Sequence, residues 1–377
     1  MVGLERSVLP LAAEVEFGLA ARTAILSFVA AFGLSKALSN YAAGRLGDRW
    51  GRRPVLILGW AIAVPVAPLL MWAPTWGWIV GANVLLGASQ GLAWSTTVIM
   101  KIDLAGPRRR GLAMGINEFA GYVAVAGSAL AAGYVATRYG LRPAPFALGL
   151  AYVAAGGVLS VFAIRETRGH AAHEALRPVA PPPDVFVRTS FRDPTLSSVC
   201  QAGLVNNAND AMAWGLFPLM FAAAGLAVDR IGWLAALYPL VWGAGQIPAG
   251  AISDRFGRKW PIVVGMTVQG VAIVMVAAAA SFTAYAVSTV LLGVGTALVY
   301  PTLLAAVGDA ADPSWRASAV GVYRLWRDLG YVAGAVVAGV VADTLGPTAA
   351  TVGLGVATVA SGLVVAVRMP TGAADPS

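Results

Sequence analysis

The chain has 377 residues, of which 58% are hydrophobic and only 12% are charged. A typical soluble domain carries about twice that share of charge, so an ordinary soluble fold with a polar surface is excluded. The formal net charge of +8 suits either a nucleic-acid partner or arginines that anchor membrane helices, and the positions of the charges decide between them. With one cysteine, two histidines and no GxxxxGK[ST] sequence, we expect no disulfide, metal, cofactor or bound ATP.

Apolar runs of about 20 residues, the length with which a helix crosses ~30 Å of hydrocarbon, recur along the chain. They predict an all-α protein that spans the lipid bilayer many times. The first segment, residues 1–19, is too short and too charged to cross alone. Eleven complete spans are placed at 22–43, 54–73, 77–101, 111–135, 144–164, 195–221, 231–250, 261–280, 283–307, 317–341 and 347–367.

Two halves of the chain repeat each other with a constant shift of 206 residues (44 to 250). The charged matches are Asp48 with Asp254, Arg52 with Arg258, Asp103 with Asp309, and Arg110 with Arg316. Such matches in one ungapped register indicate a duplicated unit. The longest polar break, rich in proline and charge, separates the halves. We therefore expect an N-terminal bundle at 1–164, a linker at 165–194 and a C-terminal bundle at 195–377.

The repeat also concerns the N-terminus. "SVLPL" at 7–11 resembles "GLFPL" at 215–219, but far fewer residues precede Pro10 than precede Pro218 in its helix. We therefore expect twelve helices in the whole protein, with helix 1 lacking roughly 14 or more residues upstream of Met1.

The orientation follows from the basic residues. Breaks after the even-numbered helices hold most of the lysines and arginines, and the linker is among them. The opposite breaks hold Arg22, Arg138, Arg142 and Arg230. Because positive residues mark the cytoplasmic side, the basic breaks and the C-terminus are expected in the cytoplasm, and the net charge requires no nucleic acid.

The stretch "GRLGDRWGRR" at 44–53 resembles the signature of the major facilitator superfamily, which lies between helices 2 and 3. The residues on its pattern are Gly44, Asp48, Arg49, Gly51, Arg52 and Arg53. A degraded copy at 250–259 carries Gly250, Asp254, Arg255, Gly257 and Arg258. The resemblance covers essentially the whole chain. It implies two six-helix bundles that rock about one substrate site near the bilayer midplane.

In that family the signature residues help to close the cytoplasmic side. Here, Gly44 and Gly47 would permit close helix approach, and Asp48 can face the positive N-terminal end of a helix. The expected ion pairs are Arg52 with Asp103 and Arg258 with Asp309. The alternative is that these are ordinary solvated charges in a turn. The chain also departs from the family, because Gly87 stands where many proton-coupled members carry an arginine three residues before "QG".

Charges within the spans mark a candidate site. A charge in hydrocarbon costs at least ~2.5 kcal/mol on insertion scales, so such charges normally face a cavity. The spans 54–73, 144–164, 261–280 and 347–367 contain none, and the family places helices 3, 6, 9 and 12 against lipid. The candidates for substrate binding or coupling are Arg6, Lys36, Glu118, Asn206, Asn207, Asp210, Arg324, Arg327 and Asp328.

One face of the span 317–341 carries four polar residues at spacings i, i+3, i+4 and i+7, namely Arg324, Arg327, Asp328 and Tyr331. We expect Arg324 to neutralise part of the charge of Asp328, which leaves Arg327 to find an acid on another helix or an anionic ligand. The repeat places Glu118 opposite Arg324, which predicts an asymmetric site with one basic wall.

Two interpretations of these charges stay open. In the first, the cations attract an anionic or strongly polar small solute, and Glu118, Asp210 or Asp328 takes a proton. Arg327→Ala should then abolish transport without reducing expression. In the second, the charges pair among themselves and lock the helices in one state. The tryptophans that are candidates to line the cavity are Trp94, Trp214 and Trp326.

A secondary transporter of a small organic solute is therefore the favoured function, with protons as a candidate coupling ion. Hydrophobic drug efflux by the same fold is one alternative, although the Gly-Pro element of helix 5 in many drug antiporters is absent. A non-transporting receptor is another. An enzyme would need an acid, His or Ser cluster at one membrane face, and none is expected, because both histidines lie in the linker. We expect a monomer in a prokaryotic plasma (inner) membrane.

Overall fold

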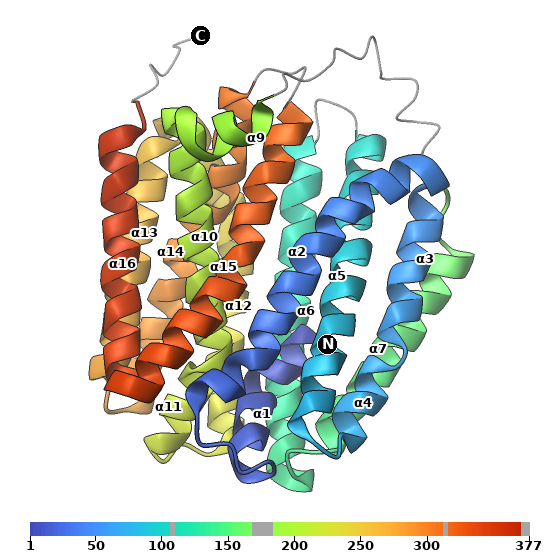
Figure 1. Ribbon diagram of the computed structural model, residues 1–377, viewed down its shortest axis with the longest axis vertical. Helices are drawn as coiled ribbons and strands as arrows, with labels where there is room; N and C mark the ends of the chain where they lie inside the picture. Colours follow the sequence, from blue (N-terminus) through green and yellow to red (C-terminus); the bar gives the residue numbers. More distant parts are fainter. Residues whose placement is uncertain (106–109, 168–183, 312–315, 371–377) are drawn as a thin grey trace.

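The computed structural model describes residues 1–105, 110–167, 184–311 and 316–370. Within these ranges all regular structure is helical, and the long helices run side by side (Figure 1). This confirms the expected all-α architecture. We call the end at which α2 meets α3 the linker end, and the end at which α2 begins the far end.

The first half of the chain contributes seven helical segments. They are α1 (Val2–Val15), α2 (Arg22–Trp50), α3 (Arg52–Ala63), α4 (Val66–Trp72), α5 (Trp76–Ala105), α6 (Arg110–Tyr139) and α7 (Ala144–Phe162). The expected span 54–73 is thus two helices, because Pro65 cannot donate the backbone hydrogen bond that would continue α3.

The second half begins with two short segments on the linker end and continues with seven helices. They are α9 (Val185–Val187), η2 (Arg188–Arg192), α10 (Pro194–Gly215), α11 (Phe217–Ala223), α12 (Val228–Phe256), α13 (Lys259–Ala278), α14 (Phe282–Ala310), α15 (Arg316–Leu345) and α16 (Pro347–Arg368). The expected span 195–221 is broken just before Pro218, for the same reason as the first break.

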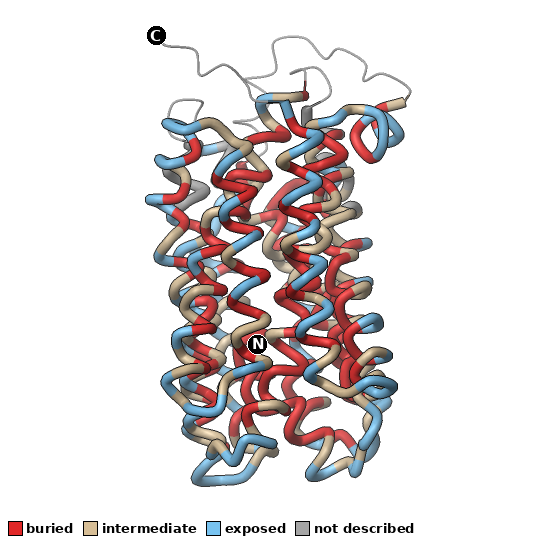
Figure 2. The backbone as a smooth tube through the Cα atoms, turned by 90° about the vertical axis from the view of Figure 1, so that its left-hand side faces the viewer, coloured by how far each residue is buried: buried red, intermediate tan, exposed pale blue. Residues whose placement is uncertain are grey.

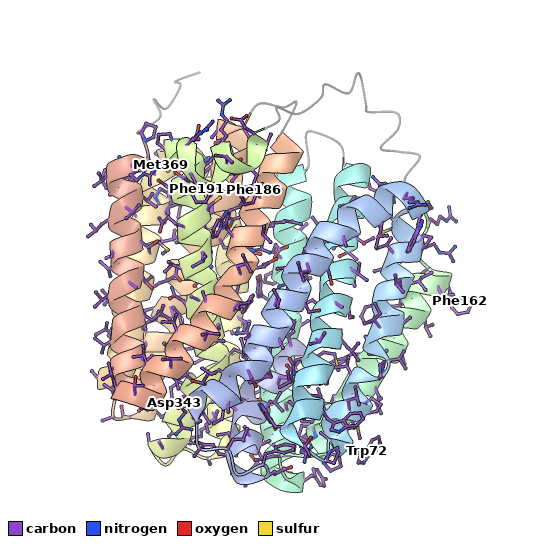
Figure 3. The ribbon with its side chains drawn as sticks, in the orientation of Figure 1. Trp72, Phe162, Phe186, Phe191, Asp343 and Met369 are labelled. Carbon is purple, nitrogen blue, oxygen red and sulfur yellow. The ribbon has the colours of Figure 1, made fainter. Side chains whose placement is uncertain are left out.

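The helices that contain the four charge-free spans lie at the edges of the molecule. Figure 1 shows α3 and α7 at one edge and α13 and α16 at the other. Buried residues line the inner faces, and exposed ones lie outside (Figure 2). Large apolar side chains such as Trp72 and Phe162 point outward from the edge (Figure 3). Eight spans among the described residues are long and apolar enough to cross a bilayer.

Helices from the two halves meet along two seams, α2 against α15 and α6 against α12. Within the first half, α5 packs on α2 through small residues. A Cβ added at Gly87 would lie 2.4 Å from the carbonyl oxygen of Phe32, so only glycine fits there. A Cβ at its repeat counterpart, Gly293, would lie 3.0 Å from the carbonyl oxygen of Tyr238 on α12. Close helix packing therefore accounts for the glycine at the position where many family members carry arginine.

Candidate functional site

A cavity of about 590 Å³ lies between the two halves. Arg6 on α1 and Tyr331 on α15 lie at its inner end, and the lining continues to Asp254 and Arg258 at the linker end. The Asp254 side chain is 72% exposed, so the cavity opens toward the linker end. The predicted candidates that line it are Arg6, Lys36, Glu118, Arg324 and Arg327.

Four other candidates are buried behind this lining. Asp210 and Asp328 are fully buried but hold lining arginines, as described next. Asn206 and Asn207 are buried in α10, and neither belongs to the cavity lining in the described part of the chain. Their amides lie 3.5 Å apart at the nearest donor and acceptor. We therefore assign these two asparagines to packing between helices.

Arg6 and Asp210 form a two-pronged ion pair across the two halves. The Arg6 guanidinium nitrogens lie 2.7 and 2.9 Å from the two carboxylate oxygens of Asp210. The Tyr331 hydroxyl donates a further hydrogen bond of 2.5 Å to Asp210, and the Arg6 guanidinium lies 5.4 Å from the Trp214 ring centre. Each charge thus has a partner among protein groups from α1, α10 and α15, and the Arg6 Nε is left without a hydrogen bond in the described structure.

Asp328 pairs with Arg327 and not with Arg324. Two nitrogens of Arg327 donate to one Asp328 oxygen at 2.9 and 2.7 Å, and the third donates to the Tyr300 hydroxyl at 2.7 Å. The other Asp328 oxygen accepts from the Asn40 amide of α2. The expected Arg324–Asp328 contact and the expected unpaired Arg327 are therefore both wrong. A fully buried carboxylate needs several donors, and Arg327 with Asn40 supplies them.

Three lining charges are left without an ion-pair partner among the described residues. Lys36 lies over the rings of Phe32 and Tyr331, with its nitrogen 5.5 and 5.3 Å from their centres. Arg324 has a buried Nε without a hydrogen bond. Glu118 accepts one hydrogen bond of 3.0 Å from Asn117, and its second oxygen has none. These three side chains are the groups available to a ligand.

Aromatic rings form the wall next to Glu118. The rings of Trp94 and Tyr122 have centres 6.3 Å apart, and Tyr122 lies at the same distance from Tyr300. Trp242 lies behind them, 3.7 Å from Tyr122. Among the three tryptophans singled out from the sequence, only Trp94 lines the cavity in the described part of the chain. Trp326 instead donates to the Ser190 hydroxyl of η2.

The signature residues lie at the linker end. Gly51 and Gly257 have φ of 95° and 76°, which explains a glycine at this turn in both copies. The expected Arg258–Asp309 pair is present at 2.7 Å, and Arg258 also holds Asp254 at 2.6 Å. Partial burial opposes the charge on Arg258, but these carboxylates outweigh it and raise the pKa of its guanidinium. Arg255 lies over the Phe256 ring.

The expectations about the first copy of the signature, at 44–53, are not confirmed in the described residues. A Cβ at Gly47 would meet open space, so the expected close helix approach there is wrong. The surroundings of Gly44 and the side chains of Asp48 and Asp103 lie outside the described residues. The positive N-terminal end of α3 is occupied by Glu166, which accepts from the backbone N–H groups of Arg52 and Arg53 at 2.9 and 3.0 Å. This acid at the start of the linker was not among the residues singled out from the sequence.

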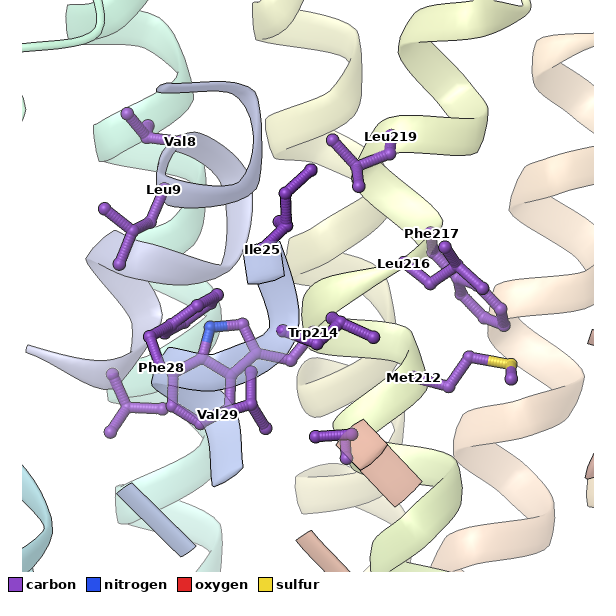
Figure 4. Packing of buried hydrophobic residues seen from close by; sticks show 14 of the residues in the cluster. Val8, Leu9, Ile25, Phe28, Val29, Met212, Trp214, Leu216, Phe217 and Leu219 are labelled. Atoms are coloured by element: carbon purple, nitrogen blue, oxygen red, sulfur yellow. The ribbon is translucent and has the colours of Figure 1, made fainter. Parts of the chain in front are cut away.

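The far end of the molecule is closed by contacts between the halves. The Asp343 carboxylate at the end of α15 accepts from the backbone N–H groups of Arg22 and Thr23, where α2 begins. Gly133 on α6 and Gly232 on α12 lie in direct backbone contact. Trp214 of the second half packs edge-to-face against Phe28 of the first half (Figure 4). Asp343 at this end is labelled in Figure 3.

Comparisons with known proteins agree with this architecture. The sequence profile of the Major Facilitator Superfamily matches residues 4–208 and 199–377. The MFS-type transporter STM4428 of Salmonella typhimurium is 26% identical over 330 residues, which are 82% of this chain and 78% of that protein. The methyl viologen resistance protein SmvA of the same species is 30% identical over 129 residues, which are 33% of this chain and only 26% of that protein.

Solved structures share the same fold. The nucleoside transporter NupG superposes with a TM-score of 0.80 at 11% identity, over 98% of this chain and 96% of that one. A POT family transporter in complex with a thioalcohol-conjugated peptide gives 0.76 at 14% identity, over 97% and 93%. At such identities the likeness concerns the fold alone. Because the family profile covers nearly the whole sequence, the chain belongs to the major facilitator superfamily.

Proposed function

We propose that this chain is a secondary transporter that moves a small organic anion through the cavity between its halves. The observation that carries this proposal is the state of the four lining cations that lie away from the linker end. Arg6 and Arg327 have carboxylate partners, whereas Lys36 and Arg324 have none among the described residues. Cations in a low-dielectric cavity without partners favour an anionic ligand, because bound charge offsets their desolvation.

The two ends of the cavity suit alternating access. In this structure the cavity opens at the linker end and is closed at the far end by the α2–α15 and α6–α12 seams. To release solute at the other side, those seams must part while the linker end closes. The bundles at 1–164 and 195–377 are proposed as the rocking units, with the linker at 165–194 joining them. The signature residues and their second copy would stabilise the closed linker end.

Orientation and coupling complete the proposal. The basic breaks favour a cytoplasmic linker end in a prokaryotic plasma (inner) membrane, so the cavity in this state would face the cytoplasm. Protons are a candidate coupling ion, because Glu118 is a cavity carboxylate without a cationic partner within ion-pair distance in the described residues. The other candidate carboxylates, Asp210 and Asp328, are each held by an arginine.

Efflux of an organic cation is a second candidate function. Glu118 and the rings of Trp94 and Tyr122 favour a cation at one wall. The partial likeness to a methyl viologen resistance protein supports the same class, since methyl viologen is an organic dication. The two candidates differ in which lining charges they require.

Counterflow in proteoliposomes tests the proposal. Purified protein preloaded with a set of unlabelled organic acids should exchange a labelled acid from the same set. Arg324→Gln and Lys36→Gln should each reduce exchange by about tenfold or more, because each removes a charge-assisted contact. Arg230→Gln, which removes a charge at the far end, is the matched control. Exchange of methyl viologen but of no acid would favour the second candidate. No exchange of any solute by folded protein would favour a receptor.

A further inference from the structure

We propose that Glu118, Trp94 and Tyr122 form a cation subsite, so that the transported organic anion also carries a protonated amine. This inference rests on the proposed function, because it adds a second contact to the same ligand. The anionic group would bind between Lys36 and Arg324, and the amine would bind at Glu118.

The three subsite residues come together through the packing of α5 on α6. Glu118 and Tyr122 are four residues apart on α6, so their side chains share one face of the helix. Trp94 on α5 reaches this face because residue 121 is glycine: a Cβ there would lie 2.3 Å from the indole ring. All three side chains line the cavity. A carboxylate in the same cavity lining as two aromatic rings is a favourable environment for an ammonium group.

A hydrogen-bond relay prepares Glu118 to accept a cation. Lys101 on α5 donates to the side-chain oxygen of Asn117. This contact turns the Asn117 amide nitrogen toward Glu118, to which it donates at 3.0 Å. One Glu118 oxygen is therefore occupied by a neutral donor, and the other has no partner among the described residues. The relay leaves one acceptor position of the carboxylate for a ligand.

The basic wall does not neutralise Glu118 directly. Arg327, Arg324 and Lys36 line the same cavity as Glu118, but in the described structure none lies within the 4.0 Å of an ion pair. Arg327 is instead bound to Asp328. The acid and the two unpaired cations thus face one cavity without contact between them. A ligand with an acid group and an amine would satisfy both sides, whereas a simple anion would leave Glu118 unpaired.

Matched ligand sets test this assignment. The probes are 3-phenylpropionate, phenylalanine and 2-phenylethylamine, together with butyrate, 4-aminobutyrate and butylamine. Binding to the purified full chain is measured by tryptophan fluorescence and by thermal stabilisation. In at least one set the amino acid should bind about tenfold or more tightly than the acid alone, as expected for a charge-assisted contact. Glu118→Gln should reduce that ratio to about one.

Two further variants distinguish loss of the cation subsite from loss of folding. Glu5→Gln makes the same change at a buried acid of α1 that does not line the cavity in the described structure, and it should keep the amine preference. Trp94→Leu removes one ring face and should reduce the preference by about threefold or more. Both are compared with Glu118→Gln for elution volume and melting temperature, so that an unfolded sample is recognised.

The outcomes separate the two proposals. If acids bind through Arg324 without any amine preference, or if Glu118→Gln keeps the preference, the cation subsite is wrong and the anion transporter stands. If only the amines bind, the proposed anion transport fails and the subsite proposal fails with it. If no member of either set binds, the subsite assignment is likewise overturned.

Discussion

Arg6 and Asp210 are buried charges that join the two halves at the inner end of the cavity. Their side chains are 5% and 0% exposed. Breaking a buried pair by removing one partner costs about 3–5 kcal/mol, because the other charge is left desolvated. We therefore expect Arg6→Gln to lower the free energy of unfolding by that amount, as measured by denaturant titration in detergent. Arg230→Gln should change it little, and an equally small loss for Arg6→Gln would contradict a buried pair.

Arg327 and Arg324 should respond differently to mutation although they lie one turn apart. Arg327→Ala leaves Asp328 buried without its main partner, so we expect it to lower both transport and stability. We therefore expect Arg327→Ala to reduce expression as well. The sequence alone had predicted unchanged expression. Arg324→Gln should abolish transport and lower the melting temperature far less. Melting curves and counterflow on the same samples compare the two, and equal destabilisation would contradict the assigned partners.

At the level of helices, the packing of α2 on α5 depends on glycine, which has no side chain to separate the two backbones. We expect Gly87→Ala to destabilise the protein, because the new methyl group would force α5 away from the α2 backbone. Gly81→Ala on the same helix has open space around its Cβ and should be neutral or slightly stabilising, by up to about 1 kcal/mol. Melting temperatures of the two variants in one detergent measure the difference. Similar values would show that α5 can shift without cost.

The repeat of helices also places cavity residues in pairs. Trp94 on α5 corresponds to Tyr300 on α14, and both line the cavity. Glu118 on α6 likewise corresponds to Arg324 on α15. Equivalent helices thus contribute equivalent lining positions, while the inverted charge makes the site asymmetric. A ligand with unlike ends fits such a site better than a symmetric one.

At the scale of the whole molecule, the contact between Asp343 and the start of α2 stabilises the closed far end. A carboxylate that accepts two backbone N–H groups at a helix N-terminus contributes about 0.5–2 kcal/mol. Asp343→Asn removes the charge, so we expect it to shift the population toward a state open at the far end, by about fivefold for a loss of ~1 kcal/mol. The corresponding position of the first half, Thr137, only bonds within its own helix.

Spin labels across the far end measure this shift. Cysteines introduced at Ala20 and Leu345, both exposed, report the separation of α1–α2 from α15 when Cys200 is replaced by serine. Asp343→Asn should increase the long-distance fraction. Asp229→Asn, the same change of charge at the start of α12, should not. Identical distance distributions for Asp343→Asn and the parent would show that other far-end contacts hold the state.

Much of the architecture follows from sequence alone. Hydropathy located the long helices, with the largest error at the end of α2, expected at residue 43 and observed at Trp50. It could do so because insertion into the bilayer depends on local apolar length and charge. The two breaks at Pro65 and Pro218 were the exceptions, since hydropathy does not report the backbone N–H that a proline lacks. The repeat and the signature likewise indicated the family, and the charge-free spans indicated which helices lie at the edges.

Only the tertiary structure decided which charges pair. The spacing on α15 favoured Arg324 as the partner of Asp328, but Asn40 and Tyr300 arrive from other helices and make Arg327 the better partner. The roles of Glu166 and Asp343 were hidden for the same reason, since each caps a helix distant in sequence. Local pattern therefore determined the helices and the family. The choice among buried charges, and with it the groups left for a ligand, depends on neighbours that only the assembled bundles bring together.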